Sequence, residues 1–216
     1  MGTLPPAIHR AILIVDVESF GDPSRTDANQ VAVRRRMYAA LQRSFAKSGI
    51  RWADCYTEDR GDGAFVLVPP SVPKSWLVSR VPGHLNDTLV RRNAASPPQE
   101  RIRLRMALHA GEVQRDAHGV AGASLVQAFR LIEAPVLKSA LADSPGVIAL
   151  IVSDWFYQEV ERQDEAAEPS SFHQVRAVTK ETDTAAWVRV LAGREASGRT
   201  DGGRQPAPSP TERART

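Results

Sequence analysis

Cysteine is nearly absent from this chain of 216 residues, which contains a single one, Cys55. One thiol excludes an internal disulfide and any zinc site built from several cysteines. Because Cys55 lies in an apolar stretch, we expect a buried and unreactive thiol. The fold must therefore be stabilised by a hydrophobic core, and a content of 42% hydrophobic residues is enough to build one.

Long apolar runs are absent as well. The longest, 11–15 and 147–152, fall far short of the roughly 20 residues of a membrane-spanning helix. The first ten residues contain two prolines and no apolar segment of signal-peptide length. We therefore expect a cytoplasmic protein without a membrane segment.

A large excess of charge of one sign is also missing. The formal net charge is +3, and the segment 194–216 contributes +2 of it through five arginines and three acidic residues. The rest of the chain is nearly neutral, which gives little support for a nucleic-acid or membrane surface. The run Arg34-Arg35-Arg36 is spread around the circumference of a predicted helix, so nucleic-acid binding ranks last among the functions considered.

Composition divides the chain into two parts. From residue 193 onward Gly, Ser, Pro and Arg replace nearly all large apolar residues, so the segment 193–216 is predicted to be a disordered tail. Residues 7–192 have the size of one domain and contain neither an internal repeat nor a second linker.

The pattern of apolar residues predicts an α+β domain. A continuous apolar run at 11–17 is typical of a buried central strand. A helix capped by Asp27 is expected to end near Gly49, and Pro135 should interrupt a helix that begins at Gly122. Six further strands are predicted by short apolar or alternating runs: 52–56 and 64–68, which form a hairpin, then 101–108, 147–152, 172–178 and 186–191. Weaker helical patterns occupy 74–93 and 154–160.

Hairpins and helices together indicate a mixed sheet with helices on one face, rather than a doubly wound parallel sheet. The strand 101–108 alternates between apolar residues and arginines. We interpret these arginines, Arg101, Arg103 and Arg105, as a solvated face without a function.

Two acidic residues occupy positions that favour chemistry. Asp16 ends the most buried strand, and Asp62 lies in the glycine-rich turn of the predicted hairpin. If the strands 11–17 and 64–68 are antiparallel neighbours, the two carboxylates converge and provide the hard oxygen ligands that Mg²⁺ or Mn²⁺ prefers. The alternative is that Asp16 caps a helix and Asp62 only makes a turn.

Four short motifs follow one another in a fixed order. They are D-V-E-S-F from Asp16, R-G-D-G around Asp62, H-A-G-E-V from His109 and G-A-S-L-V-Q-A-F-R-L from Gly122, with Lys180 shortly before the last strand. This order resembles the catalytic domain of the class III nucleotide cyclases. The resemblance extends over roughly 11–190, which is nearly the whole domain.

The resemblance implies a ferredoxin-like βαββαβ core with extra C-terminal strands, and a head-to-tail homodimer with two sites at its interface. In each site Asp16, Asp62 and Val17 would hold two Mg²⁺ or Mn²⁺ ions over a nucleoside triphosphate, with the backbone as far as Phe20 near the phosphates. The implied reaction is attack of the ribose 3′-hydroxyl on the α-phosphorus with release of pyrophosphate. Its product is a 3′,5′-cyclic mononucleotide.

By the same resemblance, the partner protomer would complete each site. Arg130 would stabilise the charge that develops on the phosphate, and Lys180 would hold the leaving pyrophosphate. Glu58 and Gly119 stand at the two base-reading positions. His109 belongs to a motif that has an architectural role in the family, so we do not expect it to be catalytic.

The first departure from the family pattern concerns catalysis. The family has an asparagine four residues before the arginine, where this chain has Val126, which can neither donate nor accept a hydrogen bond. Loss of one such donor typically costs about 10²- to 10³-fold in rate. Gln127 or Ser124 would have to substitute, and Gln127 lies about 100° around the helix from Val126, which disfavours that substitution.

The second departure concerns the base. The Glu58 carboxylate can accept hydrogen bonds from guanine, but also from uracil N3 or cytosine N4, and an adenine-reading lysine is missing. Gly119 has no side chain and does not reproduce the usual purine-reading pair. GTP or a pyrimidine triphosphate is therefore favoured over ATP. Bacterial pyrimidine cyclases of anti-phage defence belong to the same family, and a short catalytic domain with a changed base pocket is compatible with them.

Two functional hypotheses follow. One is a cyclase, a phosphorus–oxygen lyase that depends on Mg²⁺ or Mn²⁺ and makes a cyclic mononucleotide for intracellular signalling. The other, motivated by Val126, is a catalytically degenerate domain that binds a nucleotide or a protein partner.

Overall fold

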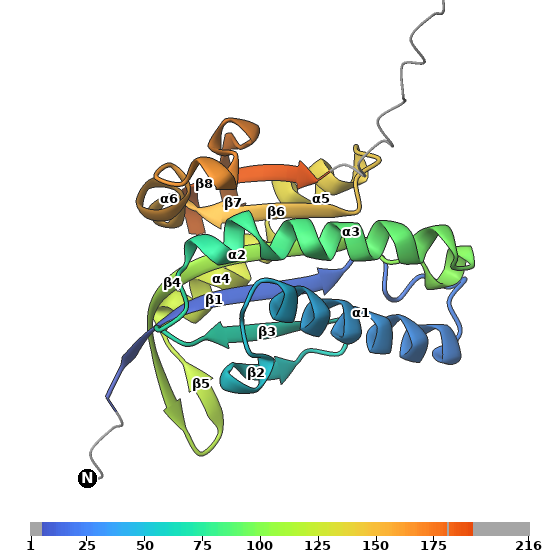
Figure 1. Ribbon diagram of the computed structural model, residues 1–216, viewed down its shortest axis with the longest axis horizontal. Coiled ribbons are helices and arrows are strands. Elements are labelled where there is room, and N and C mark those ends of the chain that lie inside the picture. The colour runs from blue at the N-terminus through green and yellow to red at the C-terminus, as the bar shows by residue number, and fades with distance from the viewer. Residues whose placement is uncertain (1–5, 181, 192–216) are drawn as a thin grey trace, which may run out of the picture.

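The computed structural model describes residues 6–180 and 182–191, and within them eight strands form a mixed sheet (Figure 1). The order of neighbouring strands is β2-β3-β1-β4-β6-β8-β7, and β5 pairs with β4. The strands are β1 (Ile8–Val17), β2 (Tyr56–Asp59), β3 (Gly63–Val68), β4 (Leu104–Asp116), β5 (Gly119–Ala121), β6 (Ile148–Ser153), β7 (His173–Thr179) and β8 (Thr182–Leu191). Neighbours are antiparallel apart from β4 and β6, which are parallel.

The first part of the sheet confirms the expected ferredoxin-like core. The longer elements up to β4 follow the βαββαβ order, and the four core strands lie in the order β2-β3-β1-β4. Strands β5 to β8 are the C-terminal additions. The predicted tail, 193–216, and the last residue of the predicted domain, 192, lie outside the described residues.

Helices cover both faces of the sheet (Figure 1). The helices on one face are α1 (Asp27–Lys47), α2 (Ser75–Ser79) and α3 (Val81–Ala94), and those on the other are α4 (Ala123–Glu133) and α5 (Pro135–Ala142). The short α6 (Asp154–Phe156) follows β6 and continues into a π-helical turn, Tyr157–Glu161. Among the described residues, none of these helices combines the length and the apolar character needed to span a membrane.

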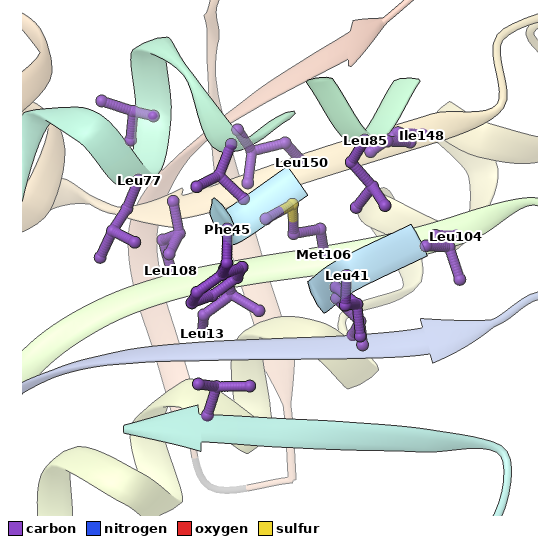
Figure 2. Close-up of a cluster of buried hydrophobic side chains, with 14 of the residues drawn as sticks. Leu13, Leu41, Phe45, Leu77, Leu85, Leu104, Met106, Leu108, Ile148 and Leu150 are labelled. Atoms are coloured by element: carbon purple, nitrogen blue, oxygen red, sulfur yellow. The ribbon is translucent and has the colours of Figure 1, made fainter. Parts of the chain in front are cut away.

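The prediction of helices on one face was therefore wrong, and β1 shows why. Leu13 and Val15 pack into a core with α1 and α3, whereas Ile12 and Ile14 pack into a second core with α4 and α5. A continuous apolar run, rather than an alternating one, is typical of a strand buried on both faces. Figure 2 shows the first core, in which Phe45 of α1 lies over Leu13.

The N-cap of α1 lies one residue earlier in the sequence than predicted. Thr26, rather than Asp27, is the N-cap residue, and its hydroxyl oxygen accepts a hydrogen bond from the amide of Asn29. The Asn29 side chain in turn accepts from the Thr26 amide, which completes a capping box. The helix ends at Lys47, close to the predicted end.

The hairpin before β3 differs from the prediction in its first strand. Trp52–Asp54 forms a 3₁₀ turn, and β2 begins only at Tyr56. Glu58 therefore lies on a strand rather than in the turn, opposite Phe65 of β3. The antiparallel pairing of β1 with β3 is confirmed, and it places Asp16 opposite Gly63.

The remaining elements agree more closely with expectation. Pro135 is the first residue of α5, so the predicted break in the helix is confirmed. Pro82 falls in the first turn of α3, where proline is well tolerated, and separates α3 from α2. The strand predicted at 101–108 begins later and continues to Asp116, where it forms a hairpin with β5.

The double-sided core gives a direct prediction for Leu13, whose side chain is 0% exposed. We expect Leu13→Ala to lower the free energy of unfolding by about 2–5 kcal/mol, because it leaves a cavity beneath α1. Urea denaturation followed by circular dichroism measures this change. The matched control is Val31→Ala, which removes a side chain that is 66% exposed and should change stability by less than about 0.5 kcal/mol. Equal losses in both variants would contradict the assignment of this core.

Candidate active site

The centre of the candidate site is the carboxylate of Asp16. Alternation along β1 places its side chain on the face covered by α4 and α5, at the end of the strand. The backbone amide of Val17 donates to the carbonyl oxygen of Asp62 at 2.9 Å, so the turn that carries Asp62 is tied to the end of β1. The two predicted metal-binding residues, Asp16 and Asp62, therefore both lie near the C-terminal end of β1.

Gly63 provides the space beside Asp16. A Cβ atom at this position would lie 2.2 Å from the carbonyl oxygen of Val15, which is closer than any side chain allows. The backbone of β3 can therefore approach β1 closely only because residue 63 is glycine. This close approach holds the turn with Asp62 beside the end of β1.

The electrostatics of Asp16 are unusual for an aspartate. Burial raises its pKa to about 6, the positive charge of Arg105 opposes this rise, and the charge of Asp62 adds to it. One carboxylate oxygen of Asp16 lies 2.5 Å from the guanidinium of Arg105. The other oxygen, Oδ1, is buried and has no hydrogen-bond partner within residues 6–180 and 182–191. A buried, unpaired carboxylate oxygen next to a second carboxylate is unfavourable unless a cation or a proton is bound there.

These features fit a divalent cation. Asp16 Oδ1 and the Asp62 carboxylate are hard oxygen donors, and Asp62 lies close enough to raise the pKa of Asp16. The described part of the chain contains no group of three or more His, Cys, Asp or Glu side chains placed to hold a metal ion. An ion at Asp16 and Asp62 would therefore need further ligands from substrate phosphates or water.

The arginines of β4 are the residues that sequence analysis misjudged. The Arg105 side chain is only 16% exposed and pairs with Asp16, and Arg103 pairs with Glu18 at 2.9 Å. Only Arg101 is exposed as expected. The antiparallel pairing of β1 with β4 places Arg105 directly opposite Asp16. The sequence alone does not show this register. Once it is known, an ion pair is expected, because an arginine on a buried face needs a carboxylate partner.

The loop after β1 leads from Asp16 to α1. The amide of Glu18 donates to the carbonyl oxygen of Arg103 at 2.9 Å, which adds a second connection between this loop and the segment before β4. Ser19 adopts a positive φ of 52°, an uncommon conformation for a residue other than glycine. Phe20 is half-buried and lines a cavity of about 400 Å³ with Arg34. The structure thus places Phe20 in the loop expected near the phosphates, with its side chain next to the first turns of α1.

The two predicted base-reading positions meet. A Cβ atom at Gly119 would lie 3.6 Å from Oε2 of Glu58, an ordinary van der Waals contact. The Glu58 carboxylate accepts from the hydroxyl of Tyr56 and from the guanidinium of Arg60, each at 3.0 Å. Tyr56 and Arg60 therefore fix the orientation of Glu58, a role that sequence analysis did not assign to them.

Of the two predicted catalytic cations, Arg130 is hydrogen-bonded to Thr179, the residue before Lys180. The Arg130 guanidinium donates to the carbonyl oxygen of Thr179 at 3.1 Å, and the Thr179 hydroxyl donates back to the carbonyl oxygen of Arg130 at 3.2 Å. Lys180 follows Thr179 in the turn between β7 and β8, with an exposed side chain. Val126, one helical turn before Arg130 on α4, is 53% exposed.

Asp16 lies at the opposite end of the sheet from Lys180. In register, Asp16 pairs with Arg105, Arg105 with Ala149, and Ala149 with Val190 of β8. Lys180 precedes the start of β8, which lies eight residues before Val190, or about 26 Å along the strand. A single chain therefore holds Asp16 and Lys180 apart.

His109 and Cys55 are not part of the candidate site chemistry. Burial lowers the pKa of His109 to about 4, and its Nδ1 lies 2.8 Å from the hydroxyl of Ser153, so the ring is a neutral structural group. The Cys55 thiol is half-buried rather than fully buried, and burial raises its pKa to about 11. The expectation of an unreactive thiol agrees with this pKa.

The architecture is that of the class III nucleotide cyclase catalytic domain, and comparison with solved structures identifies this fold. The guanylyl cyclase Cya2 is 14% identical, with a TM-score of 0.59 over 91% of this chain and 98% of that one. An adenylate/guanylate cyclase/hydrolase from Silicibacter pomeroyi is 19% identical, with a TM-score of 0.59 over 86% of this chain and 98% of that one.

A third structure, the guanylate cyclase domain of RhGC from Catenaria anguillulae in complex with GTP, is 15% identical. Its TM-score is 0.54 over 86% of this chain and 97% of that one. No model of a protein family and no curated protein matches the sequence.

The raised pKa of Asp16 predicts a pH-dependent stability in the absence of divalent ions. Because the folded pKa of about 6 lies above the ordinary 3.8, the fold favours the protonated carboxyl. Its contribution to stability is complete below about pH 4 and is lost as the pH rises through about 6. Relative to Asp16→Asn, we expect the wild-type protein to lose about 1–2 kcal/mol between pH 4 and 7, allowing for screening by solvent.

Urea denaturation in EDTA at several pH values measures this loss. Asp16→Asn is the matched control, since the amide has nearly the same shape and does not titrate. Parallel pH profiles for the two proteins would show that the Asp16 carboxyl has an ordinary pKa.

Proposed function

We propose that the protein is a nucleotidyl cyclase, which converts a nucleoside triphosphate into a 3′,5′-cyclic mononucleotide and pyrophosphate. One observation carries the proposal. At the end of the central strand β1, the buried Oδ1 of Asp16 lies near Asp62 and has no hydrogen-bond partner among the described residues. Two carboxylates at this position suit a divalent ion that also binds the phosphates of the substrate. The proposal includes the cytoplasmic location expected from the sequence.

Asp16 and Asp62, together with the backbone of Val17, would hold Mg²⁺ or Mn²⁺, two ions in each site. Such ions lower the pKa of the attacking ribose hydroxyl and neutralise charge on the phosphates. The loop as far as Phe20 would lie along the phosphates. Arg105 keeps part of the negative charge of Asp16 balanced and fixes the direction in which the carboxylate points.

Arg130 and Lys180 would act on the other side of the substrate. In this proposal the guanidinium of Arg130 stabilises negative charge on the α-phosphate during attack, and the ammonium of Lys180 binds the leaving pyrophosphate. Because these residues and Asp16 lie at opposite ends of one sheet, a complete site requires a second protomer. A head-to-tail dimer brings the Asp16 end of one protomer to the Lys180 end of its partner, and it does so twice by symmetry.

The base is proposed to be guanine or a pyrimidine rather than adenine. Tyr56 and Arg60 occupy one lone pair on each Glu58 oxygen, and each oxygen can accept one further hydrogen bond. The two remaining acceptor positions of Glu58 suit a base with N–H donors, such as guanine, cytosine or uracil, and adenine is disfavoured because the adenine-reading lysine is missing. The missing side chain at Gly119 leaves room beside the carboxylate. A role in cyclic-nucleotide signalling, including anti-phage defence, would follow from a pyrimidine product.

The second candidate is a catalytically degenerate cyclase-type domain that binds a nucleotide or a protein. The exposed Val126 favours this candidate, because it stands where a hydrogen-bond donor is expected and provides none.

An assay of all four ribonucleoside triphosphates with Mn²⁺, read by mass spectrometry, decides between the two. We expect one cyclic mononucleotide, lost in Asp16→Ala and in Asp62→Ala, because each removes a metal-binding carboxylate. The exposed Asp143 supplies the control Asp143→Ala, which should keep its activity. Val126→Asn should raise the rate by about 10²-fold by restoring a donor. If the wild-type protein and Val126→Asn both fold but make no product from any triphosphate, the cyclase proposal is wrong and the degenerate binding domain is supported.

The shared site makes a separate prediction for mixed dimers. Asp16→Ala and Lys180→Ala should each be inactive alone, whereas their co-expressed mixture should recover about a quarter of wild-type activity, because half of the dimers contain one intact site. A mixture of Asp16→Ala with Asp62→Ala is the matched control. It should stay inactive, since both changes affect the same half of the site. Failure of the first mixture to recover activity would contradict a site shared between protomers.

A further inference from the structure

The face opposite the candidate active site carries a strongly basic groove. It lies between α1 and α3, which run side by side over the sheet (Figure 1) and contact each other. The groove has a volume of about 520 Å³. We call it the α1–α3 groove and define it by its lining residues: Arg36, Arg43, Lys47, Thr88, Arg91, Arg92, Ala95 and Ser96.

The basic residues form two facing stripes. On α1, Arg36, Arg43 and Lys47 are separated by seven and four residues, which places them on one side of the helix. On α3, Arg91 and Arg92 lie one turn after Thr88 and face the same groove. The run at 34–36 does not indicate this arrangement, because the groove arises from two helices that are distant in the sequence.

In the described part of the chain, an acid neutralises one of the five cations of the groove. Arg36 pairs with Glu100 at 2.6 Å and donates to the hydroxyl of Ser96 at 3.1 Å. The other four cations are Arg43, Lys47, Arg91 and Arg92. Across residues 6–180 and 182–191, their side chains have no ion pair and no hydrogen bond, and no acid lines the groove.

The four like charges repel one another, although solvent screens much of this repulsion because Arg43, Lys47 and Arg91 are exposed and only Arg92 is half-buried. The negative ends of the helix dipoles stabilise the basic residues of the last turns, Lys47 of α1 and Arg91 and Arg92 of α3. The dipoles do not account for Arg43 or for the absence of an acid between the helices. An anion in the groove would remove the repulsion.

The lining also restricts the kind of anion. None of the described residues that line the groove has an aromatic or large apolar side chain, so none of them can stack on a base or hold a hydrophobic ring. The hydroxyls of Thr88 and Ser96 already donate to backbone carbonyl oxygens, at 2.8 and 2.7 Å. Binding is therefore left to guanidinium and ammonium groups, which suit phosphate oxygens.

We propose that the α1–α3 groove is a binding site for a short polyphosphate chain, recognised through its phosphates alone. The α1 stripe from Arg36 to Lys47 spans about 16 Å along the helix axis, enough for a chain of three or four phosphates. Four unpaired cations match the charge of a triphosphate. The ligand is either a free polyphosphate anion or the phosphate tail of a nucleotide. The site is separate from Asp16 and does not depend on the proposed cyclase activity.

A single-stranded nucleic acid fits the groove less well. Sites for single strands usually combine basic residues with aromatic side chains on which the bases stack, and the α1–α3 groove has none. Glu100 also neutralises the Arg36 end, so the basic track is bounded rather than continuous along the surface.

Isothermal titration calorimetry with inorganic tripolyphosphate tests the proposal, in EDTA and at about 0.15 M salt. EDTA removes the divalent ions that binding at Asp16 and Asp62 would need. We expect Arg43→Gln/Arg92→Gln to weaken binding by about tenfold or more, because two charge-assisted contacts are lost. Arg43→Lys/Arg92→Lys keeps the charge and should retain most of the affinity.

The matched control is Arg35→Gln/Lys74→Gln, which removes two cations that do not line the groove and should leave binding unchanged. Titrations with pyrophosphate and with each nucleoside triphosphate distinguish the two sources. Equal affinity for tripolyphosphate and all four nucleoside triphosphates would identify the phosphate tail of a nucleotide as a ligand. Tighter binding of tripolyphosphate or pyrophosphate would identify a free polyphosphate anion as the ligand. Circular dichroism of each variant verifies folding.

Three outcomes would overturn the proposal. The first is absence of tripolyphosphate binding to the folded wild-type protein at millimolar concentration. The second is an equal loss of affinity in the groove variant and in the Arg35→Gln/Lys74→Gln control. The third is binding of a single-stranded oligonucleotide through Arg43 and Arg92 without binding of tripolyphosphate, which would identify a nucleic-acid surface instead.

Discussion

The close pairing of β1 with its two neighbours is the constraint on which the candidate active site depends. On one side Gly63 allows the backbone of β3 to approach Val15 more closely than any side chain would permit. On the other side the register of β4 places Arg105 opposite Asp16. A shift of one residue in either pairing would turn the site residues to the other face of the sheet. The position of the Asp16 carboxylate at the end of β1 is thus fixed by backbone hydrogen bonds and not by a flexible loop.

Asp16 combines two opposing effects. Burial makes its charge unfavourable and raises its pKa, whereas the ion pair with Arg105 compensates for part of that cost. The compensation is incomplete, since burial outweighs the charges of Arg105 and Lys138, Asp62 adds negative charge, and Oδ1 has no partner among the described residues. A buried carboxylate in this state is suited to a cation that arrives together with a substrate.

The two faces of the sheet differ in what they offer a ligand. The α4 and α5 face carries Asp16, Glu58 and Arg130, spread from one end of the sheet to the other. The α1 and α3 face carries the basic α1–α3 groove. Because a strand directs alternate residues to opposite faces, the same central strands support both faces, and chemistry on one face does not require changes on the other.

Parts of the fold were predictable because they rest on local patterns. The apolar run at 11–17 predicted β1, the helical spacing after Asp27 predicted α1, and Pro135 marked a break that the structure confirms. The first strand of the hairpin was misplaced, since the aromatic Trp52 resembles a strand residue but forms a 3₁₀ turn. Local patterns also suggested helices on one face, because they do not record which side of a strand each helix covers.

By itself, the sequence determined the residue types of the candidate site and their order along the chain, including Asp16, Asp62, Arg130 and Lys180. Only the tertiary structure decided which of these lie together. It placed Asp62 beside Asp16, Lys180 at the far end of the sheet, and Arg105 in an ion pair where a solvated side chain was expected. The physical reason is that strand register and helix packing are set by contacts between residues distant in sequence, and charge compensation in a buried site follows from those contacts.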